Sequence, residues 1–244
     1  MEIPNPLNLK HWEKSSPASV FGCIIMWSII SLITQISIPG KPFTFKTRLV
    51  SLLHAVVSSM LCFKFIAWGP FDFGGPNTPG QNLVMNVTGG YFIYDAIVST
   101  TYEIIHKKVD IPMLVHHVVS ISGCIWCFME NVSGAELALC TLLAEISNPF
   151  MHAVLTLEDL KMNGSILHPI CQGLFLLTYT IARIFISPYF LTWQTIISPK
   201  PTMMIKIEAF LMQAVSFLWF GKICMMVYET AFGKKKKDDN KKGK

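Results

Sequence analysis

Residues 110–120 read Asp110-Ile-Pro-Met-Leu-Val-His116-His117-Val-Val-Ser120, and they open an apolar stretch that continues to residue 129. About 20 mainly apolar residues are enough for an α-helix to cross the hydrocarbon core of a bilayer. Two adjacent histidines inside such a stretch are unusual, because ionisable side chains in a membrane are costly and mark functional positions by default. The stretch therefore predicts a transmembrane helix that carries a functional site.

Six further stretches of similar length and composition lie on either side of this one. Together the predicted spans are 18–38, 48–68, 83–105, 111–129, 134–157, 166–190 and 203–230. Helices are favoured over barrel strands because the runs are long and lack a two-residue alternation. We expect an all-α membrane protein of about seven transmembrane helices, whose first span is retained rather than cleaved as a signal peptide.

The composition agrees with a membrane protein. Hydrophobic residues make up 52% of the chain and charged residues 14%, whereas soluble domains carry about 25% charged residues. The net charge of +5 lies in residues 234–244, which hold seven Lys and two Asp. Because a nucleic-acid-binding protein would spread its basic residues over a folded face, we expect no nucleic-acid partner.

Basic residues in the joints between spans predict the orientation. The joints after the first, third and fifth spans and the tail hold most of the Lys and Arg, and such an excess marks the cytoplasmic side. We therefore expect a lumenal amino terminus and a cytosolic carboxyl terminus. Lys241 and Lys242 resemble the dilysine signal that returns membrane proteins to the endoplasmic reticulum; a solvated tail that meets anionic lipid heads is the alternative.

Several predicted spans carry polar residues at helical spacing. Glu145, Asn148 and His152 fall three and four residues apart and thus share one helix face. The residues expected to face a common interior are His54, Asp95, His116, His117, Glu145, Asn148, His152, Tyr179 and Arg183. That interior is either a hydrogen-bonded seam between helices or a cavity filled by water or lipid.

Imidazoles beside carboxylates support two kinds of chemistry. A neutral imidazole attacks a thioester or activates an amine, and a carboxylate orients it. In such an enzyme His116, His117 and Glu145 are the catalytic candidates and acyl-CoA is the co-substrate. Metal binding is the other chemistry, but membrane di-iron enzymes use repeated His boxes and this chain has one isolated pair. We expect no bound metal or resident cofactor.

The quoted segment, followed by Leu142-Leu-Ala-Glu145-Ile-Ser147-Asn148-Pro149-Phe150, resembles the TLC domain. That family includes the ceramide synthases, the translocating-chain-associating membrane proteins and small TLC-domain-containing proteins. The resemblance implies six helices around a central cavity that opens to the cytosol. The expected organisation is a lumenal segment (1–17), a first helix with its joint (18–45), a TLC domain (46–230) and a Lys-rich tail (231–244).

In ceramide synthases, the paired histidines and a later His-Asp-x-Ser-Asp segment carry N-acylation by acyl-CoA. His116 and His117 match the pair, but residues 144–148 read Ala-Glu-Ile-Ser-Asn, a form similar to the small TLC-domain-containing proteins. The resemblance thus implies a role in membrane lipid homeostasis, with an acyl chain or lipid bound in the cavity. A ceramide-synthase-like acyltransferase and a non-catalytic partner or chaperone are the alternatives, and a homodimer is an open alternative to a monomer.

Overall fold

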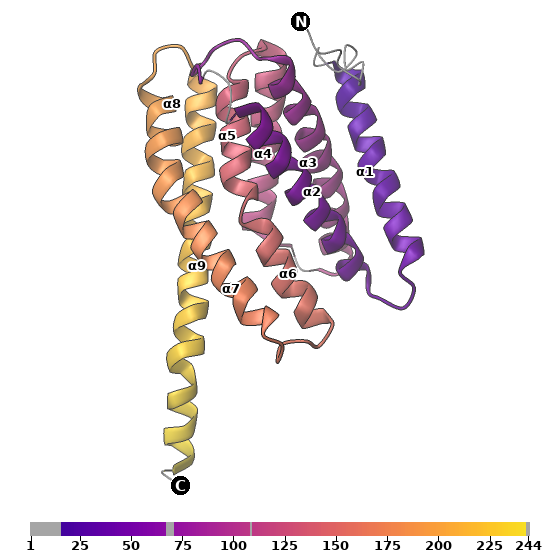
Figure 1. The fold of residues 1–244 in the computed structure, drawn as a ribbon, viewed down its shortest axis with the longest axis vertical. Helices are drawn as coiled ribbons and strands as arrows, with labels where there is room; N and C mark the ends of the chain where they lie inside the picture. Colours follow the sequence, from indigo (N-terminus) through magenta and orange to yellow (C-terminus); the bar gives the residue numbers. More distant parts are fainter. Residues whose placement is uncertain (1–15, 67–70, 108, 243–244) are drawn as a thin grey trace, which may run out of the picture.

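The computed structural model describes residues 16–66, 71–107 and 109–242, with side chains as far as Glu229 except that of Ile66. These residues form helices and short joints (Figure 1). In chain order the helices are α1 (Pro17–Ser37), α2 (Phe43–Ile66), α3 (Pro79–Ile105), α4 (Ile111–Glu130), α5 (Gly134–Glu145), α6 (Asn148–Asp159), α7 (Leu167–Tyr179), η2 (Thr180–Trp193), α8 (Gln194–Ile197) and α9 (Met203–Lys242). Because α5 leads into α6, and α7 into η2 and α8, the described residues form seven rods.

The all-helical prediction is confirmed, but the number of membrane spans needs a correction. Six rods are long and apolar enough to cross a membrane: Pro17–Ser37, Phe43–Phe65, Ile111–Glu130, Gly134–Asp159, Leu167–Ile197 and Met203–Glu229. The seventh predicted span, 83–105, is helix α3, which is not among them because it is too polar. Helix α3 packs against α1, α2, α4 and α5, and these contacts bury the polar side chains of its first half, among them Gln81, Asn82 and Asn86.

Six of the rods form a closed ring. Helix α2 contacts α5 and α6, α5 contacts η2, η2 contacts α9, α9 contacts α4, α4 contacts α3, and α3 returns to α2. Helix α1 lies outside this ring against α2 and α3 (Figure 1). Helices α3 and α5 also touch across the ring. The interior is therefore divided into a part beside α2 and a part beside α4, η2 and α9.

Local sequence explains where the helices begin. Ser16, Thr78 and Asp110 cap α1, α3 and α4 by accepting a backbone N–H with their side chains, which satisfies donors that a helix start leaves free. Four helices (α1, α3, α4 and α6) carry Pro at their first or second position, where its missing N–H costs nothing.

The predicted span 134–157 is one rod made of two helices. Pro149 stands in the first turn of α6. It has no backbone N–H to donate to the carbonyl four residues earlier, and its ring clashes with that carbonyl. Residues 146–147 form a turn there, and this α5–α6 break lies beside Glu145 and Asn148. The rod that corresponds to the predicted span 166–190 is longer than expected and runs from Leu167 to Ile197. Its middle part, η2, is a π-helix that includes Pro188.

The basic joints lie at one end of the bundle. The α1–α2, α3–α4 and α6–α7 joints and the end of α9 are all at the lower end in Figure 1. Forty residues of α9 extend about 60 Å, twice the thickness of a bilayer core, so its last turns project beyond the other helices. The compartment at this end stays a prediction, and the side chains of Lys241 and Lys242 lie outside the described residues.

Candidate functional site

His54 of α2 belongs to a tightly packed group beside α1 and α3. Its imidazole, 1% exposed, stacks on the ring of Tyr91 with centroids 3.6 Å apart. The indole of Trp27 meets both rings edge-on, at 5.6 and 5.3 Å, and donates its N–H to the carbonyl of Val87 over 3.0 Å. Nε2 of His54 lies 2.9 Å from Oγ of Ser58. We call Trp27, His54 and Tyr91 the aromatic stack; it buries the imidazole of His54.

The two adjacent histidines have different surroundings. Nε2 of His117 lies 3.1 Å from Oδ2 of Asp95 on α3, and the His117 side chain is buried. The ring of His116 instead contacts Phe92 and Trp219, with centroids 6.1 and 5.0 Å away. Neighbours in a helix point about 100° apart, so only the structure decides which histidine meets Asp95.

Arg183 of η2 connects that helix to the α5–α6 break. Its guanidinium is buried and donates from Nη2 to the carbonyl of Ala144 and to Oδ1 of Asn148. The amide of Asn148 donates in turn to Oε2 of Glu145 over 3.0 Å. The same guanidinium lies over the ring of Tyr179, 4.9 Å from its centroid. We call this group the Arg183 clamp.

Glu145, the predicted partner of a catalytic histidine, is held in this clamp. Its Oε2 lies 3.8 Å from Nδ1 of His54, whereas the carboxylate bonded to His117 is that of Asp95. His152 lies on α6, beyond the break, and Tyr179 donates its hydroxyl to the carbonyl of Ser216 over 2.8 Å. Most of the predicted interior is thus a hydrogen-bonded seam.

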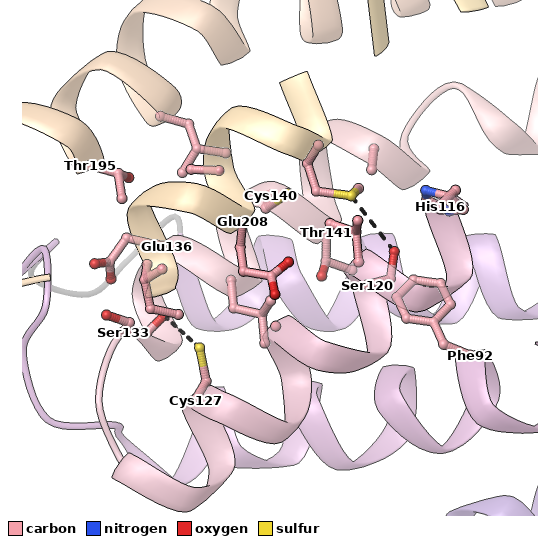
Figure 2. Close-up of a pocket in the computed structure, with 18 residues that line it drawn as sticks. Phe92, His116, Ser120, Cys127, Ser133, Glu136, Cys140, Thr141, Thr195 and Glu208 are labelled. Carbon is pink, nitrogen blue, oxygen red and sulfur yellow. Dashed lines mark hydrogen bonds between the residues drawn. The ribbon is translucent and has the colours of Figure 1, made fainter. Parts of the chain in front are cut away.

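A pocket lies in the other part of the ring, between α4, α5, η2, α8 and α9 (Figure 2). Counted with its open mouth, the space between the protein atoms is about 630 Å³. Small and aliphatic residues form much of the wall, including Gly123, Leu137, Ala144 and Ala209. Of the predicted residues, His116 lines this pocket, and Arg183 lines a smaller one beside it.

The pocket also contains two carboxylates that the sequence analysis missed. Glu208 of α9 is 8% exposed, and its Oε1 accepts a hydrogen bond from Oγ of Ser122 over 2.6 Å. Glu136 of α5 accepts the backbone N–H of Gly74 over 2.5 Å. Both lie in apolar stretches, so the criterion that selected Glu145, an ionisable residue within a span, could have found them.

The arrangement is suited to binding an apolar molecule with a polar end, and it offers His116 as a base or nucleophile at the pocket wall. Within the described ranges, no three His, Cys, Asp or Glu side chains gather in the way a metal site requires.

The range that matches a known protein family coincides with the ring of helices. The family model of the TLC domain matches residues 44–225 of the 244. This range begins at the second residue of α2 and ends within α9, so it contains the six ring rods and the paired histidines but not α1. The chain belongs to the TLC-domain family (TRAM, LAG1 and CLN8).

Proposed function

We propose that this protein binds an acyl chain or a lipid in the pocket between α4, α5, η2 and α9, and that it acts through this ligand in membrane lipid homeostasis. The observation that carries the proposal is a largely apolar pocket inside a ring of six rods, five of which are long and apolar enough to cross a membrane. Pockets of this kind, with a few polar groups at defined points, are typical of sites for small apolar ligands.

The surroundings of the pocket support a ligand that comes from the bilayer. The helices that form its outer wall expose large apolar side chains, among them Phe185 of η2 and Phe210 of α9. One layer of helices therefore separates the pocket from lipid tails. Burial of apolar surface contributes roughly 25 cal/mol per Å², which favours a chain over a small polar solute.

His116 supports a second candidate, acyl transfer from acyl-CoA. Its ring lines the pocket, and its Nδ1 is buried with no hydrogen-bond partner among the described residues. In this reaction an imidazole nitrogen attacks the thioester carbonyl, the C–S bond breaks, and the CoA thiolate leaves and takes up a proton. The resulting acyl-imidazole then passes its acyl group to an amine or hydroxyl acceptor.

Filling the pocket tests the lipid-binding proposal. Ala209 lines it, so Ala209→Phe places a ring where a chain would lie. Ile207→Phe is the matched control, because Ile207 is 46% exposed on the same helix. We expect the wild type and the control to retain co-purified lipid in native mass spectrometry and Ala209→Phe to lose it. If the purified wild type carries no lipid and shows no thermal shift with any acyl probe, the proposal is wrong.

Intact-mass measurement tests the transferase candidate. The purified protein is incubated with a mixed acyl-CoA pool, and wild type is compared with His116→Ala, His117→Ala and Glu145→Ala. An acyl-sized mass increment or CoA release that requires His116 supports the reaction. If the protein holds lipid but gives neither an acyl adduct nor free CoA, the lipid-binding proposal stands and the transferase candidate is wrong.

A further inference from the structure

The charges that line the pocket are unevenly distributed. Its walls contain the carboxylates of Glu136 and Glu208 and the imidazole of His116, while no Lys or Arg is among the described residues that line it. In Figure 2, His116 and Phe92 lie at one end and Glu136 at the other, with Glu208 between them. One end of the pocket is therefore acidic.

Glu208 has an acceptor that is free to bind a ligand. Its Oε1 is paired with Ser122, but Oε2 is buried with no hydrogen-bond partner among the residues that the structure describes. A buried acceptor without a donor costs about 1–3 kcal/mol, and more when it is charged. A donor supplied by a ligand would remove this cost.

Helix α4 leaves space at this acceptor. Gly123 faces Glu208, and a Cβ placed on this glycine would lie 3.8 Å from Oε2. Any longer side chain at position 123 would enter the space beside the carboxylate. Seven residues separate Gly123 from His116, which is about 10 Å along the helix. A ligand with its polar end at Glu208 can thus extend the first part of its chain toward His116 and Phe92.

We infer that the pocket selects lipids whose head group donates hydrogen bonds, an ammonium or a hydroxyl, and that Glu208 receives this head group. Carboxylate and phosphate heads are disfavoured, because they would meet the carboxylate of Glu208 in a medium of low dielectric. The cation Arg183 lines the adjoining pocket, where it already donates to Ala144 and Asn148. The inference rests on the proposed function, since it assigns a ligand class and an orientation to the same pocket. Glu208 is then a residue that determines specificity.

Competition binding tests the inference with probes that share one 16-carbon chain. Full-length protein in a non-ionic detergent binds tritiated 1-monopalmitoylglycerol, and the competitors are hexadecylamine, hexadecyltrimethylammonium and palmitate. In wild type, we expect hexadecylamine to compete at least about tenfold better than palmitate, the difference that one charged hydrogen bond produces. Comparison of the affinities of 1-monopalmitoylglycerol and hexadecylamine shows whether a hydroxyl or an ammonium head group binds more tightly.

Variants assign the preference to one carboxylate. Glu208→Gln keeps the shape of the side chain but removes its charge. We therefore expect the affinity for hexadecylamine to fall about tenfold and the affinity for palmitate to rise. Glu130→Gln is the control, because Glu130 is an exposed carboxylate at the end of α4. It should keep the wild-type order. If Glu208→Gln fails to fold, the ranking of competitors on wild type decides alone.

Three results overturn the inference in distinguishable ways. Equal competition by palmitate and hexadecylamine refutes the head-group selection while the proposed lipid binding stands. Equal competition by hexadecyltrimethylammonium, which has no N–H, refutes the hydrogen bond to Glu208. If no probe binds and no lipid co-purifies, the proposed function fails together with the inference.

Discussion

The aromatic stack and the pocket are built from similar residues but differ in what surrounds them. In the stack, His54 is enclosed by Trp27 and Tyr91 and bonded to Ser58. In the pocket, His116 and Glu208 each keep a buried polar atom without a partner among the described residues. An ionisable residue in a membrane span is therefore not by itself a site. Unpartnered atoms alone do not mark one either, because Nδ1 of His117 also lacks a partner among the described residues; the apolar pocket beside His116 and Glu208 distinguishes the second region.

Side-chain size explains the difference. The stack consists of an indole and a phenol packed against the imidazole, and all three side chains are buried. Around the pocket the helices meet through residues such as Gly123, Ala144 and Ala209, which are too small to fill it. Partnered polar groups in a low dielectric stabilise and rigidify a bundle, whereas unpartnered ones raise its free energy until a ligand binds. Under the proposed function, the first region stabilises the bundle and the second binds the ligand.

The largest expected effect is at Trp27, because its buried ring completes the aromatic stack. This residue lies on α1, outside the range that matches the family. Trp27→Ala removes a ring that is 1% exposed and its hydrogen bond to Val87. We expect a loss of about 3–5 kcal/mol in the free energy of unfolding, measured by denaturant titration in mixed micelles. Ile29→Ala, at a residue 51% exposed on the same helix, should change little. Equal stability of both variants would show that the stack does not hold the bundle.

The next largest effect is expected at the Arg183 clamp. Arg183→Leu leaves Asn148 and the carbonyl of Ala144 without their donor, which should cost about 2–3 kcal/mol. Arg183→Lys should restore only part of this, because an ammonium cannot reproduce the planar fork. Thermal unfolding in detergent measures both variants. A Lys variant as stable as wild type would mean that charge alone, without the two directed bonds, holds η2 to the α5–α6 break.

A smaller effect is expected at His117. His117→Ala removes the bond to Asp95 and should cost about 1–2 kcal/mol, with lipid binding unchanged once the protein is folded. The same denaturant titration and native mass spectrometry measure the two properties. A loss of bound lipid at unchanged stability would mean that His117 acts in ligand binding, and it would refute the distinction between the packed region and the pocket.

The smallest effect on stability is expected at His116. His116→Ala removes no hydrogen bond of Nδ1, and the side chain already borders open space, so we expect a change below about 1 kcal/mol. The change should appear in the ligand instead, as altered lipid retention or loss of an acyl adduct. A large destabilisation with no effect on ligands would contradict the contrast between the adjacent histidines.

Helix boundaries and the site were predictable to different degrees. The span 111–129 differs from α4 by one residue, because a long apolar run between polar ends determines a membrane helix. The sequence analysis treated 134–157 as one continuous helix, although Pro149 breaks this rod into α5 and α6. The span 83–105 was placed correctly as a helix and wrongly as an equivalent apolar span. Glu208 was missed because polar stripes were sought on other spans, although Gln213 and Ser216 are also buried polar residues of α9.

The amino-acid sequence by itself determined that this is an all-helical membrane protein with paired histidines in one span, since hydrophobicity and helical periodicity are local properties. The tertiary structure decided which polar groups find partners: Asp95 for His117, Asn148 for Arg183, and no described residue for Oε2 of Glu208. These pairings depend on how helices far apart in the chain rotate and pack against one another. Periodicity along one helix contains no information about that packing.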